Sequence, residues 1–131
     1  LKTVRSLVTV GAPADASHIR HLMEDQWPTL HAGQPAVITV ANRSFRLNPT
    51  FAADLTAHDV TGRAALLGRP YCIVHAVDDA IVSHDNALAL HHAAGPPKKL
   101  ASMPSGGHLF AARADAEALL GVVLGWFDNT L

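Results

Sequence analysis

Residues 71–76 read YCIVHA, an apolar run of strand length, and the acidic residues Asp78 and Asp79 follow it closely. A short apolar run that ends in polar residues is typical of a buried strand in a parallel sheet. Residues 7–10, LVTV, form a second such run, and residues 99–103, KLASM, form a third candidate. The sequence therefore predicts a sheet of about three strands.

Helical patterns lie between and after these predicted strands. Ser83 is expected to cap a helix that stops at Gly95, where two prolines follow. Near the end of the chain, apolar residues recur at helical spacing: Leu119, Val122, Val123, Trp126 and Phe127. Strands that alternate with helices predict a three-layer α/β fold, in which helices cover a parallel sheet and right-handed crossovers join its strands.

A small β-hairpin is predicted in the middle of the chain. Residues 37–40 and 45–47 are strand-like, and residues 41–44 join them. Asn42 tolerates the positive φ that a tight hairpin loop needs. This hairpin is expected to form a two-stranded excursion from the main sheet.

Helix starts flank the hairpin. Before it, Asp15 or Ser17 can cap a helix whose apolar face carries Ile19, Leu22 and Met23. After it, Asn48 and the following proline predict a second helix start, with the proline at the first helical position. No repeat or linker interrupts the sequence, so residues 1–131 are expected to form a single domain.

The composition argues against several classes of protein. The chain has 131 residues, is 49% hydrophobic and 16% charged, and has a formal net charge of -1. Because it has no run of like charges, we expect neither a nucleic-acid partner nor a polybasic membrane anchor. No segment approaches the roughly 20 apolar residues of a membrane span. No secretory signal is recognised, which favours a cytoplasmic protein. The one cysteine, Cys72, is expected to be buried and unreactive.

An acid and a histidine follow two of the predicted strands. Asp79 comes after the strand at 71–76, and His108 lies in PSGGHLF, residues 104–110, after the last strand. The carboxyl ends of parallel strands meet at one edge of a sheet, where functional residues of α/β proteins gather. In a serine hydrolase the histidine accepts the proton of the nucleophile, and the carboxylate orients the ring and stabilises the imidazolium. Two neighbouring strand ends can supply such a pair.

His75, Asp79 and Val82 follow a His-x-x-x-Asp-x-x-Val pattern, and an apolar pair and a helix follow Gly107 and His108. The first pattern resembles the acid loop of the α/β-hydrolase family, and the second resembles its histidine loop. Both belong to the C-terminal half of that fold. The resemblance implies that Asp79 is the triad acid and His108 the general base. It also implies a small-molecule ester or related acyl substrate and no cofactor.

A narrower resemblance covers other parts of the chain. Residues 10–15, 43–46 and 51–55 are similar to bacterial α/β-hydrolases of the type sometimes fused to an OsmC-like redox domain. Met23 and Trp27 fall in the region that resembles a cap over the active site. They could line an acyl pocket, although packing is their more ordinary role.

The nucleophile of such a triad is not expected within this sequence. The family order is serine, then acid, then histidine, with the serine on a Gly-x-Ser-x-Gly turn between a strand and a helix. No such pentapeptide occurs here, and the resemblance places Leu1 after the nucleophile helix. Ser6, Ser83 and Ser105 do not lie on such a turn. The chain is therefore expected to lack the nucleophile-bearing N-terminal half and to show no hydrolysis by itself.

Each candidate site residue also has an ordinary structural interpretation. Asp79 could be a carboxylate at the start of a helix, and Asp78 would be the triad acid if the register of the loop were off by one. His108 could be a solvated imidazole in a glycine-rich turn. The nine histidines include pairs that could share a helix face, His18 with His21 and His84 with His91. With a single cysteine they are expected to be surface residues without a metal site.

The first predicted strand, residues 7–10, has consequences for partners. It would pair on one side with a strand that this sequence does not contain, which leaves an apolar edge open to association. We therefore expect a homodimer, or docking to the missing N-terminal half. The competing functional interpretation is a non-catalytic half-domain that serves as an assembly or interaction module.

Overall fold

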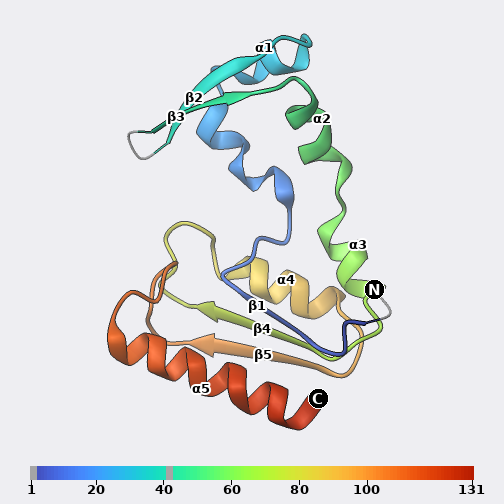
Figure 1. Cartoon of the computed structure of the whole chain (residues 1–131), viewed down its shortest axis with the longest axis vertical. Coiled ribbons are helices and arrows are strands. Elements are labelled where there is room, and N and C mark those ends of the chain that lie inside the picture. Colours follow the sequence, from blue (N-terminus) through green and yellow to red (C-terminus); the bar gives the residue numbers. More distant parts are fainter. Residues whose placement is uncertain (1–2, 41–42) are drawn as a thin grey trace. The chain divides into compact units, whose positions relative to one another are not determined.

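The computed structural model describes residues 3–40 and 43–131, and its contacts divide the chain into two units. One unit contains the residues up to Ala14 together with Val60–Leu131, and the other contains Asp15–Asp59. Figure 1 shows the elements of both units along the chain. The expectation of a single domain over 1–131 stays a prediction.

The first unit is built on a three-stranded parallel sheet. Its strands are β1 (Leu7–Val10), β4 (Tyr71–Ala76) and β5 (Lys98–Met103), in the order β1-β4-β5. Val10 is paired with Val74, and Ala76 is paired with Met103. All six residues of β4 are buried, as a central strand with both faces covered requires. The three strands predicted from the sequence are confirmed.

Helices cover both faces of this sheet, which gives three layers. Helices α3 (Val60–Ala65) and α4 (Asp85–Ala93) pack on one face, where Ile73 contacts the cluster that includes Leu90. Helix α5 (Arg113–Thr130) packs on the other face, where Trp126 joins Val74. Figure 1 shows α4 and α5 on opposite sides of the strands. Successive residues of a strand point to opposite faces, so β4 supplies both cores.

Some details of the first unit differ from the expectation. Ser83 is not the N-cap of α4: His84 holds that position, and the Ser83 hydroxyl accepts a bond from the Asp85 amide at 3.3 Å. The helix ends at Ala93 with Ala94 at its C-cap, so it stops directly before Gly95, as predicted. Cys72 is fully buried, as predicted, and burial raises the pKa of its thiol.

The second unit contains short helices and a hairpin. Its elements are the 3₁₀ helix η1 (Ala16–Met23), α1 (Trp27–His31), β2 (Ala36–Val40), β3 (Arg43–Leu47) and α2 (Thr50–Ala57). The two strands pair antiparallel, which confirms the predicted excursion. The predicted loop over 41–44 is too long, because Arg43 pairs with Val40 and Ser44 with Thr39. Asn42 lies outside the described residues.

The predicted helix starts in this unit are corrected in part. Asp15 caps η1 by accepting the Ser17 amide, but the segment forms a 3₁₀ rather than an α-helix. Helix α2 starts at Thr50 with Pro49 at its N-cap, so the predicted start, with Asn48 as N-cap and Pro49 as the first helical residue, is one residue early. Asn48 contributes its backbone carbonyl, which accepts from the Phe51 amide, and no side-chain cap forms. The side chain of Leu22 lies outside the described part of the chain.

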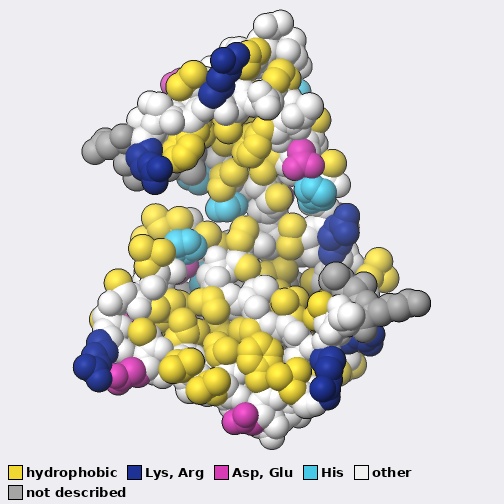
Figure 2. Space-filling view, in the orientation of Figure 1, with side chains coloured by type: hydrophobic (Ala, Val, Ile, Leu, Met, Phe, Trp, Pro, Cys, Tyr) yellow, Lys and Arg dark blue, Asp and Glu magenta, His cyan; other side chains and the backbone are white. Residues whose placement is uncertain are grey.

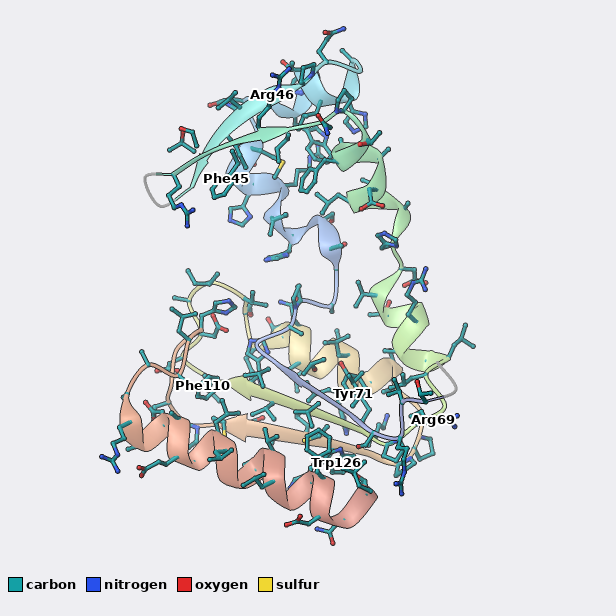
Figure 3. The ribbon with its side chains drawn as sticks, viewed as in Figure 1. Phe45, Arg46, Arg69, Tyr71, Phe110 and Trp126 are labelled. Carbon is teal, nitrogen blue, oxygen red and sulfur yellow. The ribbon has the colours of Figure 1, made fainter. Side chains whose placement is uncertain are left out.

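The core of the second unit gathers the apolar side chains of its helices and strands. The buried members are Met23, Trp27, Leu30, Ala36, Ile38 and Ala52. Met23 and Trp27 therefore pack inside this unit, and the Arg20 guanidinium lies 4.8 Å from the centre of the Trp27 ring. Figure 3 labels Phe45 and Arg46 on β3. Within residues 3–40 and 43–131, no helix is long and apolar enough to cross a membrane.

Candidate active site

Two loops leave the carboxyl edge of the sheet next to one another. The acid loop, residues 77–84, follows β4, and the histidine loop, residues 104–112, follows β5. The Val77 amide donates to the Met103 carbonyl at 2.8 Å, so the two loops start from adjacent backbone positions. The parallel pairing of β4 and β5 is what brings the loops together.

The structure brings Asp79 and His108 into contact. Nδ1 of His108 lies 3.0 Å from Oδ2 of Asp79. A carboxylate only accepts hydrogen bonds, so Nδ1 carries the proton and donates it. In a neutral ring this leaves the lone pair on Nε2, which is the arrangement a general base requires. The Asp79 side chain is 1% exposed and that of His108 is 32% exposed, so the acid is enclosed while the imidazole reaches the surface.

The carboxylate of Asp79 is held by the acid loop itself. Its Oδ1 accepts from the backbone amides of Ile81 and Val82, both at 2.9 Å. Burial raises the pKa of Asp79, but the bonds from Val82, His108 and Ile81 outweigh burial and hold the pKa below its usual value. Asp79 is therefore kept as an anion that faces the imidazole.

Asp78 takes a different position from its neighbour. Its side chain is exposed, and its Oδ1 accepts from the Gly107 amide at 2.9 Å. Asp78 therefore ties the acid loop to the histidine loop one residue before His108. The structure places Asp79, rather than Asp78, against the imidazole.

Gly11 also belongs to the site, and sequence reasoning did not single it out. It directly follows β1, has a φ of +58° and donates its amide to the Val74 carbonyl at 3.0 Å. A Cβ there would lie 3.3 Å from His108 Nδ1 and 3.6 Å from Asp79 Oδ2. Glycine is required both by the left-handed backbone and by the space beside the pair. A glycine directly after a predicted buried strand was the signal that could have revealed it.

The histidine loop gets its shape from an unusual run of backbone angles. Gly106 has a φ of +135°, Gly107 of +54° and Phe110 of +48°. The Phe110 amide donates to the Gly106 carbonyl at 2.9 Å, and the buried Phe110 ring lies over Gly106, where a Cβ would collide with it. Figure 3 shows Phe110 at this end of the sheet. The loop thus presents His108 from a turn that is fastened by a buried aromatic ring.

Exposed apolar side chains flank the pair. Val77 and Ile81 of the acid loop are 58% and 66% exposed, and Leu109 of the histidine loop is 81% exposed. Exposed apolar side chains that lie close to polar groups often mark a binding region. Figure 2 shows hydrophobic side chains grouped with a histidine in this part of the first unit.

None of the three serines considered above faces the imidazole within the described residues. Ser6 accepts from the Trp126 indole nitrogen at 2.8 Å and donates to the Pro70 carbonyl at 3.4 Å, at the amino end of the sheet. Ser105 donates to Asp115 at 2.9 Å, and Ser83 lies at the start of α4. No described serine hydroxyl forms a hydrogen bond with His108. Among the described residues, Asp79 and His108 therefore form a carboxylate–imidazole pair with no serine hydroxyl bonded to the ring.

The remaining histidines do not converge on a metal site. Among residues 3–40 and 43–131, no group of three histidine, cysteine, aspartate or glutamate side chains is placed to hold a metal ion. His84 precedes α4 and its Nε2 lies 2.8 Å from the Ser102 hydroxyl, so it does not share a helix face with His91 as the spacing suggested.

Comparisons with known proteins identify the fold. The structure is similar to that of an esterase domain from Rhodothermus marinus, with a TM-score of 0.70 and 31% identity over 95% of this chain and 50% of that one. It is also similar to alpha/beta hydrolase domain-containing protein 10 from mouse, with a TM-score of 0.71 and 18% identity over 98% of this chain and 54% of that one. The alpha/beta hydrolase GrgF from Penicillium sp. sh18 matches with a TM-score of 0.70 and 16% identity, over 99% of this chain and 57% of that one.

The chain therefore has a partial α/β-hydrolase fold, as the sequence predicted. It spans about half the length of the esterase domain and of the mouse protein. No protein-family profile matches the chain. No curated protein matches it either.

Proposed function

We propose that this chain supplies the acid and the general base of a serine-dependent hydrolase that cleaves a small-molecule ester or a related acyl substrate. The observation that carries the proposal is the 3.0 Å contact between His108 Nδ1 and Asp79 Oδ2 at the carboxyl edge of the sheet. The similarity to an esterase domain at 31% identity adds support. Membership of the α/β-hydrolase family is part of this proposal.

In the proposed reaction each residue has one task. His108 Nε2 takes the proton of an attacking serine hydroxyl and later gives it to the leaving alcohol. Asp79 keeps the ring in the required tautomer and stabilises the imidazolium that forms between the two steps. The acyl group passes to the serine oxygen, and a water molecule that gives its proton to His108 Nε2 then releases it as the acid and restores the serine, so no cofactor is proposed.

The serine is proposed to lie on a polypeptide segment outside these 131 residues. Two observations support this: the sequence contains no Gly-x-Ser-x-Gly turn, and the similar structures are about twice as long. In the same proposal the chain is the C-terminal portion of the fold, is cytoplasmic, and acts without nucleic-acid or membrane partners. Its suggested kinship with hydrolases fused to an OsmC-like domain is also a proposal.

The edge of the sheet at β1 is the proposed place of association. In the described part of the chain, β1 pairs only with β4, and its other edge is open. An unpaired edge strand invites pairing with another chain. The partner is the missing N-terminal half or a second copy, and the mass of the native assembly distinguishes between them.

Ester hydrolysis by the native polypeptide that carries this sequence tests the proposed function. Replacing His108 with alanine should leave only the background rate, because a triad without its base loses most of its catalytic rate. The matched control is His92→Ala, an exposed histidine on α4, which should hydrolyse at the normal rate. Equal rates for the two variants would leave the non-catalytic assembly module as the better interpretation.

A further inference from the structure

His75 is a buried histidine that the proposed reaction does not use. It is the fifth residue of β4, and its side chain is completely inaccessible to solvent. A buried imidazole is costly to desolvate, and the cost is recovered only through its hydrogen bonds. The contacts of its two ring nitrogens therefore show what the ring does.

The Nε2 atom of His75 contacts both ends of the acid turn. It lies 2.8 Å from the Val82 carbonyl oxygen, and because a carbonyl only accepts, Nε2 carries a proton and donates it. The same atom lies 3.3 Å from Oδ2 of Asp79, the oxygen that also receives the His108 bond. The Val82 amide in turn donates to Oδ1 of Asp79. Asp79, Val82 and His75 thus form a closed set of contacts.

The other nitrogen shows that His75 is not present only to fill space. Its Nδ1 is buried and has no hydrogen-bond partner among the described residues. A buried polar atom without a partner destabilises the folded chain. An apolar side chain of similar volume would avoid that cost, so the benefit of the ring must come from Nε2. The His84 ring packs edge-on against His75 at 5.8 Å between centres and limits its rotation.

We infer that His75 is a positioning residue for the proposed triad: its Nε2–H donates to the Val82 carbonyl and fixes the turn whose Val82 amide holds the Asp79 carboxylate, which keeps Oδ2 aligned on His108 Nδ1. This inference rests on the proposed function, in which Asp79 is the acid. Proton transfer depends steeply on such alignment, and a displacement of about 1 Å can cost roughly a hundredfold in rate. His75 touches neither the substrate nor the reacting atoms in this account.

The identity of the replacement side chain separates positioning from packing. His75→Phe keeps a ring and removes the donor. In His75→Gln the side-chain amide places an N–H near the position of Nε2, whereas in His75→Asn the amide reaches only as far as Nδ1. A positioning role predicts that His75→Gln keeps His108 aligned on Asp79 and that His75→Asn does not. A packing role alone predicts that His75→Phe preserves the site best of the three variants.

The first readout needs only this chain. In ¹⁵N-labelled protein, the proton on His108 Nδ1 should give a protected, downfield NMR signal, assigned by its loss in His108→Gln. We expect that signal to be lost to exchange in His75→Phe and His75→Asn and retained in His75→Gln. His92→Phe, the same replacement at an exposed site on α4, should leave it unchanged. A retained signal in folded His75→Asn or His75→Phe would overturn the inference.

The second readout uses the native polypeptide that hydrolyses esters. His75→Asn should lower kcat by roughly ten- to a hundredfold with KM unchanged, and His75→Gln should restore most of it. If His75→Phe fails to fold, the asparagine and glutamine pair decides alone. If the His75 substitutions leave the His108 Nδ1–H signal unchanged, the positioning role is wrong, whatever their effect on kcat. Absence of ester hydrolysis defeats the proposed function and leaves the NMR result standing.

Discussion

The acid loop and the histidine loop meet at one site, but different forces hold them. In the acid loop the buried Asp79 carboxylate accepts hydrogen bonds from two backbone amides and from the His108 ring. The histidine loop is shaped by the positive φ of Gly106 and by the buried Phe110 ring packed on it. The first loop therefore depends on buried charge, and the second depends on backbone conformation and apolar packing. Substitutions in the two loops should therefore destabilise the chain for different physical reasons and by different amounts.

The largest effect is expected from removing the buried carboxylate. Asp79→Ala leaves the buried Val82 amide and the partly buried Ile81 amide without their acceptor, which should cost about 3 kcal/mol in the free energy of unfolding. Asp78→Ala is the matched control, because it removes one bond at an exposed position and should cost less than about 1 kcal/mol. Urea unfolding of both variants measures the difference, and equal losses would show that the acid loop does not depend on Asp79.

The next effect should come from the conformation of the histidine loop. Gly106→Ala places a Cβ against the Phe110 ring at a φ of +135°, and should destabilise the chain by about 2 kcal/mol. Gly121→Ala, in the exposed interior of α5 with no atom nearby, should instead stabilise it by about 0.5–1 kcal/mol. Thermal or urea unfolding provides the comparison. If both substitutions changed the free energy of unfolding in the same direction, the proposed role of Gly106 in the loop would be wrong.

A smaller effect is expected where β1 approaches both loops. Gly11→Ala adds a Cβ 3.3 Å from His108 Nδ1 at a φ of +58°, and the backbone strain alone should cost about 1 kcal/mol. The added methyl group should also push the imidazole away from Asp79. A weakened His108 Nδ1–H signal in the NMR spectrum would report that movement, and an unchanged signal would show that Gly11 matters only for the backbone.

The smallest effect is a pH dependence of stability. The pKa of Asp79 is lower in the folded chain than its ordinary value, so between those two values the unfolded chain binds more protons. Stability should be complete above the ordinary aspartate pKa of about 3.9 and should fall as the pH drops through the folded value. Asp79→Asn should flatten this slope in urea titrations more than Asp15→Asn does. Asp15 is the control because it is an exposed aspartate whose pKa is also lowered.

The sequence was most informative where its pattern is set by burial. The strands at 7–10 and 71–76 have their predicted bounds, and the third differs by one residue. The pattern is clearest in β4, because a central parallel strand is apolar on both faces. Caps were predicted less well. Asn48 and Ser83 have the right side chains to cap a helix, but the N-cap of each helix lies one residue later. Local side-chain chemistry does not fix where the tertiary structure lets a helix begin.

The candidate site was predictable in part, because two of its residues follow predicted strands. Asp79 and His108 follow predicted strands, and parallel strand ends meet, so their proximity could be inferred. The contributions of Gly11, Asp78 and His75 could not, because each depends on an approach between segments far apart in the sequence or on the path of a loop. Such contacts leave no periodic pattern to read.

The measurement that tests the central claim most directly is the intact mass of the native protein after reaction with a fluorophosphonate probe, which labels activated serines. The account predicts a single adduct on a polypeptide heavier than the 13.8 kDa of this chain, or on a partner bound to it, and no adduct when His108 is alanine. An unlabelled native species of 13.8 kDa without a labelled partner would contradict it, and Asp79 and His108 would then form a structural pair.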